Sequence, residues 1–182
     1  GVEGISTRMV GRRSELEQLQ KAYFNAVEES ETQVVTVIGD PGLGKSRLLY
    51  EFATWAELRP EMYFIFRGRA TPAMTHRPYA MWRDLISFRF EILDNDDPAA
   101  VRQKMETGIS KLIGADDEMA HLMGHLAGFG FEDSAFLGGE PGAIAERARG
   151  AIGLFFQRLS ALDPVVLQLD DLHHSDDASL DL

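Results

Sequence analysis

Residues 39–46 read Gly-Asp-Pro-Gly-Leu-Gly-Lys-Ser and match the pattern G-x-x-x-x-G-K-[ST]. The glycines of this pattern allow backbone conformations and close approaches that a Cβ atom would obstruct. Lys45 supplies a cation for β- and γ-phosphates, and the Ser46 hydroxyl is a ligand for Mg²⁺. Asp40 and Pro41 occupy variable positions and receive no catalytic role. The spacing therefore predicts a loop that binds nucleotide phosphates, and it leaves open whether the nucleotide is ATP or GTP.

The segments on both sides of this loop are suited to present it to a phosphate. Residues 33–38 (Gln-Val-Val-Thr-Val-Ile) form a short, mostly β-branched run, which predicts a buried parallel strand. From Ser46 onward, apolar residues recur at helical spacing, which predicts a helix that reaches about Leu58 and ends before Pro60. A strand, a glycine-rich loop and a helix in this order direct backbone N–H groups and a helix N-terminus towards an anion.

A second set of chemically active residues follows another apolar run. Residues 165–169 (Val-Val-Leu-Gln-Leu) predict a strand, and Asp170 and Asp171 come directly after it. In P-loop proteins an acid at this place holds Mg²⁺, generally through water, and a second acid can accept the proton of the attacking water. We assign Asp170 to the metal and Asp171 to the role of general base. The alternative is that these acids, Asp171 above all, cap the following turn.

The composition restricts the class of protein. With 182 residues, the chain can bury one sizeable core, so we expect a single domain. The net charge is −11, and residues 71–182 carry nine Lys/Arg against nineteen Asp/Glu, so this region should repel a nucleic-acid backbone. The chain has no cysteine, no apolar stretch of membrane-spanning length and no signal segment, and we expect a cytoplasmic protein that does not enter the membrane.

The remaining patterns are mostly helical. Ser14 and Glu17 predict a capping box at the start of a helix over residues 14–28, and a second strand is expected over residues 62–66 with Arg67 at its end. Further helices are expected over residues 79–93, 99–113, 116–126 and 144–162. His121 and His125 have a metal-ligand spacing, but no third ligand is evident, so we interpret them as part of a polar helix face. Phe155 and Phe156 are expected in the core, and the two tryptophans in the core or a groove.

Two further segments resemble one family of nucleotide-binding proteins. Residues 9–16 (Met-Val-Gly-Arg-Arg-Ser-Glu-Leu) resemble the VGR-x-x-E-L box that precedes the phosphate loop in AAA+-related ATPases, and residues 169–176 (Leu-Asp-Asp-Leu-His-His-Ser-Asp) resemble their DDLHWAD segment. With the loop between them, the three motifs resemble the signal-transduction ATPases called the STAND group, over about residues 8–182. The nearest likeness is to ATPase modules of multidomain bacterial regulators, such as those fused to adenylate/guanylate cyclase domains or found in maltose-regulator-like activators.

The resemblance implies a fold. It is an α/β P-loop NTPase, a three-layer α/β/α structure with a parallel sheet, here incomplete and with a large helical insertion between the second and third strands. Within a single ATPase domain over residues 1–182, residues 1–30 would hold the N-terminal helix and the box, 33–70 the Walker A unit, 71–162 the helical region and 164–182 the Walker B strand and turn. The sensor strand and the helical lid are expected beyond residue 182, so hydrolysis by this fragment should be poor.

The resemblance also implies a site for ATP or ADP with Mg²⁺. Lys45, Asp170 and Asp171 would be catalytic, and Ser46 and Asp170 would hold the metal. His173 would connect the Walker B strand to the nucleotide state, whereas His174 stands where the family has Trp and Ser175 where it often has Ala. The nucleotide-binding residues would be Val10, Gly11 and Arg12 on the adenine side and Gly39, Asp40, Pro41, Gly42, Leu43, Gly44, Lys45, Ser46 and Arg47 around the phosphates; for Arg12, a solvated position at a helix start is the alternative.

The implied function is a nucleotide-dependent switch with slow ATP hydrolysis inside a larger regulatory protein. Its partners would be adenine nucleotide, the other domains of that protein and, in a nucleotide-dependent way, further copies of itself. Two alternatives stay open, namely a P-loop kinase that transfers the γ-phosphate to a small molecule, and a nucleotide-binding interaction module that has lost turnover.

Overall fold

The computed structural model describes residues 11–59, 63–131 and 133–182. The chain divides into two compact units, Gly1–Met62 and Tyr63–Leu182, and each is described by itself. The phosphate loop belongs to the first unit, and the strand that ends in Asp170 belongs to the second. The predicted lead-in before the box, together with Val10 and Pro60, lies outside the described residues.

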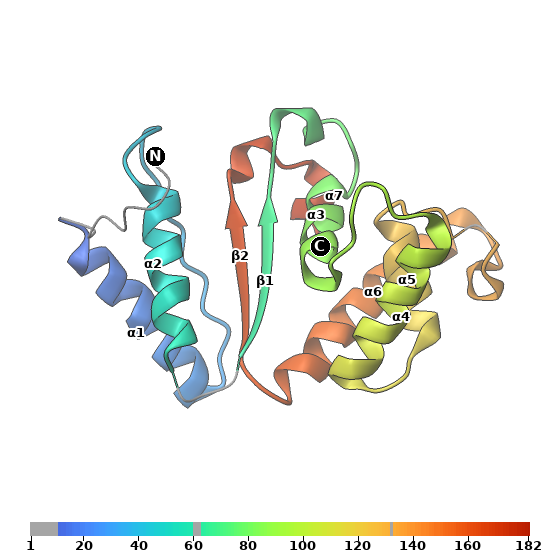
Figure 1. Cartoon of the computed structure of the whole chain (residues 1–182), viewed down its shortest axis with the longest axis horizontal. Helices are drawn as coiled ribbons and strands as arrows, with labels where there is room; N and C mark the ends of the chain where they lie inside the picture. The colour runs from blue at the N-terminus through green and yellow to red at the C-terminus, as the bar shows by residue number, and fades with distance from the viewer. Residues whose placement is uncertain (1–10, 60–62, 132) are drawn as a thin grey trace. The chain divides into compact units, whose positions relative to one another are not determined.

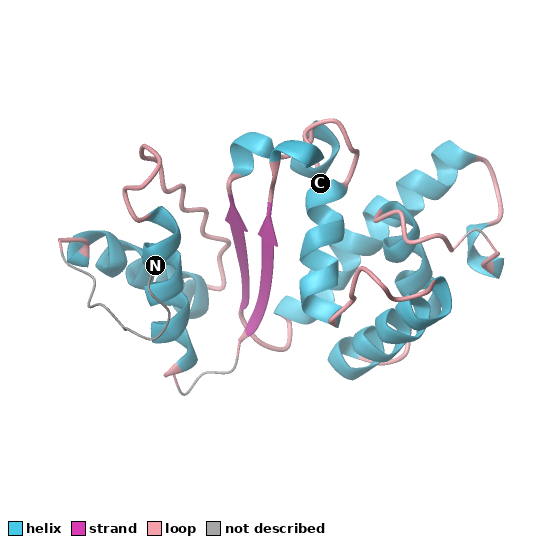
Figure 2. Cartoon of the chain, turned by 45° about the horizontal axis from the view of Figure 1, so that its top comes forward, coloured by secondary structure: helices cyan, strands magenta, loops and turns pink. Residues whose placement is uncertain are grey.

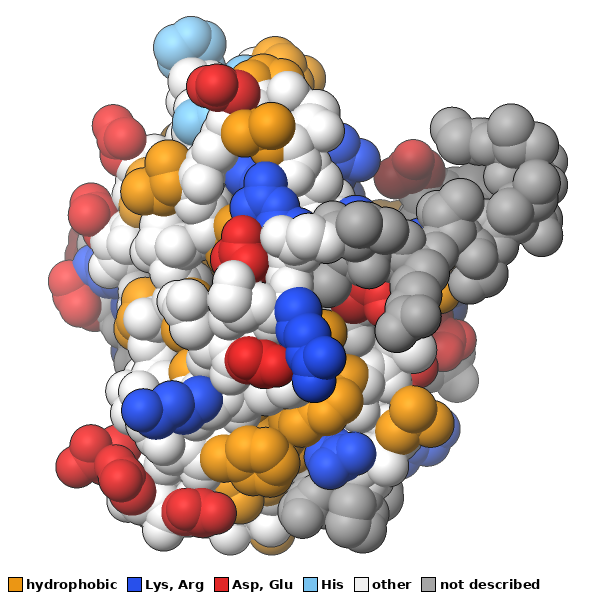
Figure 3. Space-filling model, turned by 90° about the vertical axis from the view of Figure 1, so that its left-hand side faces the viewer, with side chains coloured by type: hydrophobic (Ala, Val, Ile, Leu, Met, Phe, Trp, Pro, Cys, Tyr) orange, Lys and Arg blue, Asp and Glu red, His pale blue; other side chains and the backbone are white. Residues whose placement is uncertain are grey.

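The first unit is built on two helices, α1 (Arg13–Glu29) and α2 (Lys45–Glu57). Their apolar residues recur at helical spacing, so each helix has one face to bury. Tyr23 of α1 stacks edge-on against Trp55 of α2 with ring centroids 5.5 Å apart, and Phe52 joins this contact. Figure 3 shows hydrophobic side chains among charged ones in the lower half of the face that it views. The helix over residues 14–28 is thus confirmed to within one residue at each end.

The predicted capping box of α1 is wrong. The residue before the helix is Arg12, and no side chain caps the first N–H groups. Glu17 instead forms an ion pair of 3.0 Å with Arg13, and the Ser14 hydroxyl donates a 2.7 Å hydrogen bond to Glu15. Because the helix begins at Arg13, Ser14 lies inside the first turn, where its side chain cannot accept from the N–H groups ahead of it.

The predicted strand over residues 33–38 does not form in the described structure. These residues adopt neither helix nor strand, and Val34 and Ile38 are 85% and 89% exposed. The sequence has the composition of a strand, but the hydrogen bonds of a strand come from a neighbouring one. Within the described residues no strand pairs with this segment, so the β-branched run stays extended and uncovered.

The second unit contains a parallel pair of strands, β1 (Phe64–Arg69) and β2 (Val165–Asp170). Phe64 lies opposite Val165, and the register continues to Arg69 opposite Asp170. The two carboxyl ends therefore meet at the same edge of the sheet, as Figure 2 shows. β1 begins and ends later than predicted, and this shift changes which arginine reaches the strand end.

Four longer helices connect the two strands: α3 (Ala80–Phe90), α4 (Pro98–Ile113), α5 (Asp117–Leu126) and α6 (Pro141–Ser160). In Figure 1, α3 lies beside β1, and α4 and α5 pack with α6, which also contacts the sheet. Asp97 and Asp116 cap α4 and α5, accepting from the N–H groups of Ala100 and Met119. Short helical turns η1 (Pro72–Met74), η2 (Ala135–Leu137) and η3 (Leu172–His174) and the helix α7 (Asp177–Leu180) complete this unit.

One continuous core joins the sheet to these helices. Phe66 of β1 contacts the rings of Phe155 and Phe156 on α6 at centroid distances of 5.9 and 5.2 Å. Phe155 is fully buried, which confirms its expected core position, and Trp82 is buried as well. The predicted helix over residues 79–93 ends earlier, at Phe90, because Glu91 turns into the left-handed region and its N–H bonds to Ser87.

His121 does not lie on a polar helix face. It is buried, with Nδ1 2.5 Å from the Ser134 hydroxyl and Nε2 2.7 Å from a Glu106 carboxylate oxygen. A buried imidazole has to satisfy both ring nitrogens, and these two partners do so. In the part of the chain that the structure describes, no group of three or more His, Cys, Asp or Glu side chains could hold a metal ion.

Candidate nucleotide site

The phosphate loop leads directly into the first turn of α2. Gly42 and Gly44 have φ values of 84° and 80°, a region that glycine enters at little cost. α2 begins at Lys45, and its first turn holds Lys45 and Arg47 but no acidic residue. Cations at a helix N-terminus are unfavourable, since the helix dipole is positive there. An anion bound by the first N–H groups of α2 would reverse this repulsion, which is what a phosphate site requires.

Lys45 is folded over the loop. Its Nζ donates to the carbonyl oxygens of Gly39 and Asp40, at 2.8 and 3.2 Å. Both acceptors are solvent-exposed backbone groups that water can also satisfy, so these bonds can be exchanged for phosphate oxygens at little cost. The ammonium group therefore lies at the mouth of the loop in a conformation that a nucleotide phosphate can displace.

Arg12 connects the N-terminal box to the phosphate loop. Its Nη2 donates a 2.7 Å hydrogen bond to the carbonyl oxygen of Leu43, and its Nη1 pairs with Glu15 at 3.2 Å. The hydrogen bond from Ser14 is the largest of the causes that lower the pKa of Glu15, and Arg12 adds to it. Gly11, just before, has φ of 79°. Arg12 is thus more than a solvated residue at a helix start, because it holds the residue between two left-handed glycines.

The two acids lie where β2 ends. Asp170 is the last residue of β2, and its carbonyl accepts from the N–H of Ala70 at 3.0 Å. Asp171 follows in the left-handed region, with φ of 56°, and its own N–H donates to the Asp170 carboxylate at 3.0 Å. A non-glycine residue in this conformation is uncommon and is found most often at sites that hold it in place. The two acids thus have different partners, since the Asp170 carboxylate accepts from the backbone and that of Asp171 pairs with Arg69.

Arg69, and not Arg67, reaches this end of the sheet. Arg69 Nε lies 3.1 Å from Asp171 Oδ2, while its backbone N–H donates to Asp84 of α3 at 2.7 Å. Arg67 lies inside β1, over the ring of Phe88. The prediction placed Arg67 at a strand end because it ended the strand three residues too early. The signal for Arg69 is register, since a parallel partner puts it opposite Asp170.

The turn after the acids carries the two histidines. The rings of His173 and His174 have centroids 3.9 Å apart, and the carbonyl of His174 accepts from the Thr75 hydroxyl at 3.4 Å. Asp176, which the sequence analysis left without a role, is buried at the end of the same turn and accepts hydrogen bonds from the start of α3. These partners in α3 lie about a hundred positions earlier in the chain, so no local pattern could have predicted this contact.

The side chains at the two predicted metal-binding positions are of types that suit Mg²⁺. Hydroxyl and carboxylate oxygens are the ligands that Mg²⁺ prefers, and Ser46 and Asp170 provide them. Ser46 is exposed in the first turn of α2, and Asp170 is half-buried at the strand end. Each unit thus holds part of the predicted chemistry, with the phosphate loop in the first and the acids in the second.

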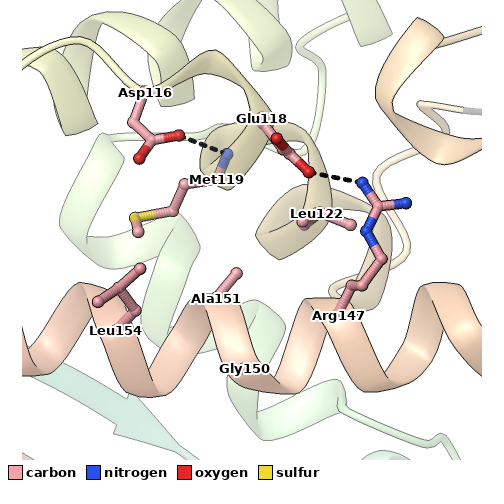
Figure 4. Close-up of a pocket in the computed structure, with 8 residues that line it drawn as sticks. All are labelled: Asp116, Glu118, Met119, Leu122, Arg147, Gly150, Ala151 and Leu154. Carbon is pink, nitrogen blue, oxygen red and sulfur yellow. Dashed lines mark hydrogen bonds and ion pairs between the residues drawn. The ribbon is translucent and has the colours of Figure 1, made fainter.

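A groove of about 240 Å³ lies elsewhere in the second unit, between α5 and α6. Figure 4 shows its apolar floor, formed by Met119, Leu122 and Leu154, and the ion pair of 2.6 Å between Glu118 and Arg147 across one side. None of the predicted nucleotide-site residues lines it in the described structure. Its charged groups are already paired, so it offers little for an ionic ligand.

A phosphate loop that opens a helix and an acid pair that ends a parallel strand, in a mixed α/β chain, define a P-loop nucleotide-binding protein. Comparison with family models agrees, because the model described as the AAA ATPase domain matches residues 8–182. The chain therefore belongs to the AAA ATPase domain family, which implies ATP binding and hydrolysis with Mg²⁺. Comparisons with curated proteins and with solved structures gave no significant match. Among the described helices, none is long and apolar enough to cross a membrane.

Proposed function

We propose that this chain is an ATP-dependent switch module of the signal-transduction type, which hydrolyses ATP slowly inside a larger regulatory protein. The contact between Arg69 and Asp171 carries this proposal, because it engages the expected general base in an ion pair. A carboxylate that is held by a neighbouring side chain has to break that contact before it can reach the attacking water, so basal turnover should be slow. Slow turnover is what distinguishes a switch, in which the bound nucleotide sets the state, from a metabolic enzyme.

In this proposal each predicted residue has one role. Lys45 compensates the charge of the β- and γ-phosphates, and the first N–H groups of α2 bind their oxygens. Ser46 and Asp170 would hold Mg²⁺, which when bound neutralises phosphate charge in the transition state. Asp171 would accept the proton of the attacking water. Val10, Gly11 and Arg12 would contact the adenine side, favouring ATP and ADP over GTP.

The proposed partners follow from the charge and from the family likeness. Residues 71–182 carry a net charge of −10, which disfavours direct nucleic-acid binding by this segment. The module would instead act on other domains of its own protein and, when nucleotide is bound, on further copies of itself. Residues 1–30, 33–70, 71–162 and 164–182 would serve as parts of one ATPase domain.

Phosphate release from ATP and nucleotide affinity together test the proposal. Lys45→Ala should weaken ATP binding by at least about tenfold, since it removes the only side-chain cation that the motif assigns to the phosphates. Asp171→Asn should bind ATP as the wild type does and lose most of its hydrolysis. Asp177→Asn, the same substitution at an exposed acid in α7, is the matched control and should change neither.

Three results would decide against the switch. ATP binding that is unaffected by Lys45→Ala would show that the phosphate loop is not the ATP site. Binding without any phosphate release from the wild type would favour an interaction module without turnover. Consumption of ATP only in the presence of an added small-molecule acceptor would favour a kinase.

A further inference from the structure

Asp176 is a buried carboxylate that accepts hydrogen bonds from both sides of a turn. Asp176 is only 3% exposed. Oδ1 accepts from the backbone N–H of Tyr79 and of Ser179, both at 2.8 Å. Oδ2 accepts from the N–H of Ala80 at 3.1 Å and from the Ser179 hydroxyl at 2.8 Å, and the N–H of Met81 lies 3.4 Å away. One carboxylate thus serves the starts of two helices, α3 and α7.

The charge of Asp176 is stabilised by dipoles. Its partners in the described structure are backbone N–H groups and a hydroxyl, and the N–H groups of Tyr79, Ala80 and Met81 belong to the positive end of α3. Burial by itself would raise the pKa of Asp176, but the hydrogen bonds from Ser179, Tyr79 and Met81 outweigh it and lower the pKa below its usual value. The group is therefore an ionised acceptor that α3 needs in place.

Two residues with strained backbone flank the contact between Asp176 and α3. Tyr79 and Asp171 are non-glycine residues in the left-handed region, with φ of 60° and 56°. Such conformations cost free energy and persist only where the surroundings hold them. The N–H of Tyr79 is held by Asp176, and the Tyr79 hydroxyl accepts from Arg149 of α6 at 3.3 Å.

The chain between Asp171 and Asp176 is short and internally bonded. His174 N–H donates to the carbonyl of Asp171 and Ser175 N–H to that of Leu172, both at 2.9 Å. The Ser175 hydroxyl contacts the sulfur of Met81 at 3.3 Å. Because only four residues separate Asp176 from Asp171 and two backbone hydrogen bonds tie them together, we expect a displacement of Asp176 to reach Asp171.

We propose that Asp176 is a positioning residue that couples helix α3 to the expected general base Asp171. Helix α3 packs on β1 and shares its core with α4, α5 and α6, so a movement of the helical region displaces the N–H groups that Asp176 accepts from. The turn then carries the displacement to Asp171 and changes the rate of hydrolysis. This role rests on the proposed ATPase function. Through it, the helical region between the strands would influence the rate of ATP hydrolysis.

The experiment compares Asp176→Asn with the wild type in steady-state ATP hydrolysis. Asparagine keeps the size but turns an NH₂ group towards N–H donors, so the connection to α3 is broken on one side. We expect kcat to fall by at least about tenfold, as small misplacements of catalytic groups do, while KM for ATP stays within about twofold because the phosphate loop is in the other unit. Hydrogen exchange should rise at residues 171–174 as well as at residues 79–81.

Asp97→Asn is the matched control. Asp97 caps α4 and accepts from the N–H of Ala100 at 2.8 Å, but it is exposed and contacts no part of the Walker B turn in the described structure. Asparagine can keep this cap, so the variant loses the charge of a capping aspartate without touching the connection, and its kcat should equal that of the wild type. Ser179→Ala, which removes one of the bonds to Asp176, should lie between the two and serves as the test variant if Asp176→Asn does not fold.

Two results would overturn the coupling. One is a folded Asp176→Asn protein with wild-type kcat, which would make Asp176 a helix cap and nothing more. The other is a loss of kcat that is matched by the loss of folded protein and by an equal change in KM. If the wild type itself hydrolyses no ATP, the proposed function fails, and hydrogen exchange decides the coupling alone: unchanged exchange at residues 171–174 in Asp176→Asn would refute it.

Discussion

Replacement of Arg69 by alanine should speed up basal ATP hydrolysis. The substitution removes the contact of 3.1 Å between Arg69 Nε and Asp171 Oδ2 and leaves the backbone bond to Asp84 in place. The Arg69 side chain is 70% exposed and that of Asp171 28%, so water screens much of the attraction. Ion pairs at such positions contribute about 0.2–1 kcal/mol. If the pair restrains the base by this free energy, its loss raises the rate by roughly 1.4- to fivefold.

The assay is phosphate release at saturating ATP over a range of salt concentrations. Salt screens exposed ion pairs, so the wild-type rate should rise with salt towards that of Arg69→Ala, and the variant should respond less. Arg147→Ala, which removes a surface pair with Glu118 in the same unit, is the control and should leave the rate and its salt dependence unchanged. Thermal unfolding of both variants should stay close to the wild type.

Two results would refute this reasoning. A rate for Arg69→Ala that is several-fold below the wild type at saturating ATP would mean that Arg69 orients Asp171 or contacts phosphate instead of restraining the base. An unchanged rate at every salt concentration would mean that the ion pair has no part in setting turnover.

Two further predictions concern stability. Gly108→Ala should lower the urea midpoint, because a Cβ there would lie 2.2 Å from Cδ1 of Phe90, and overpacking of about 1–3 kcal/mol outweighs the roughly 1 kcal/mol gained in helix propensity. Gly150→Ala, with nothing within 4 Å of its Cβ, should raise the midpoint, and a lower midpoint for both variants would contradict the packing argument. Asp176 has a folded-state pKa below its unfolded value of about 3.9, so its contribution is complete above that value and is lost as pH falls through the folded pKa. Urea midpoints measured from about pH 5 downward should therefore fall more steeply for the wild type than for Asp176→Asn, and parallel slopes would show that Asp176 is not a source of the acid sensitivity.

Local patterns predicted the helices well, because a helix takes its hydrogen bonds from its own residues. The bounds predicted for the helices over residues 99–113 and 116–126 agree with α4 and α5 to within one residue. An aspartate directly before each of these helices caps its N-terminus. The strand over residues 33–38 failed for the opposite reason, since a strand is completed by another segment and the described residues provide none. Sequence patterns detect the apolar composition of a strand and not its partner.

The contrast between local and distant partners also separates the site residues that the sequence predicted from those that it missed. The loop at residues 39–46 and the acids at 170 and 171 are visible as short motifs, because phosphate chemistry dictates their types and spacing. Arg69 and Asp176 hold those motifs in place through partners that lie 102 and about 96 positions away in the chain. No spacing rule reaches that far, so residues that position the chemistry become visible only when the strands are in register and α3 meets the Walker B turn.

The starts of α5, α3 and α2 differ in what complements their first N–H groups. Asp116, directly before α5, accepts from the N–H of Met119, and Asp117 and Glu118 in the first turn complement the helix dipole. α3 begins at N–H groups that Asp176 already occupies. α2 begins with Lys45 after two left-handed glycines and has no acid in its first turn. An anion from outside the chain would complement this start, and the spacing of Lys45 and Ser46 predicts that this anion is a nucleotide phosphate.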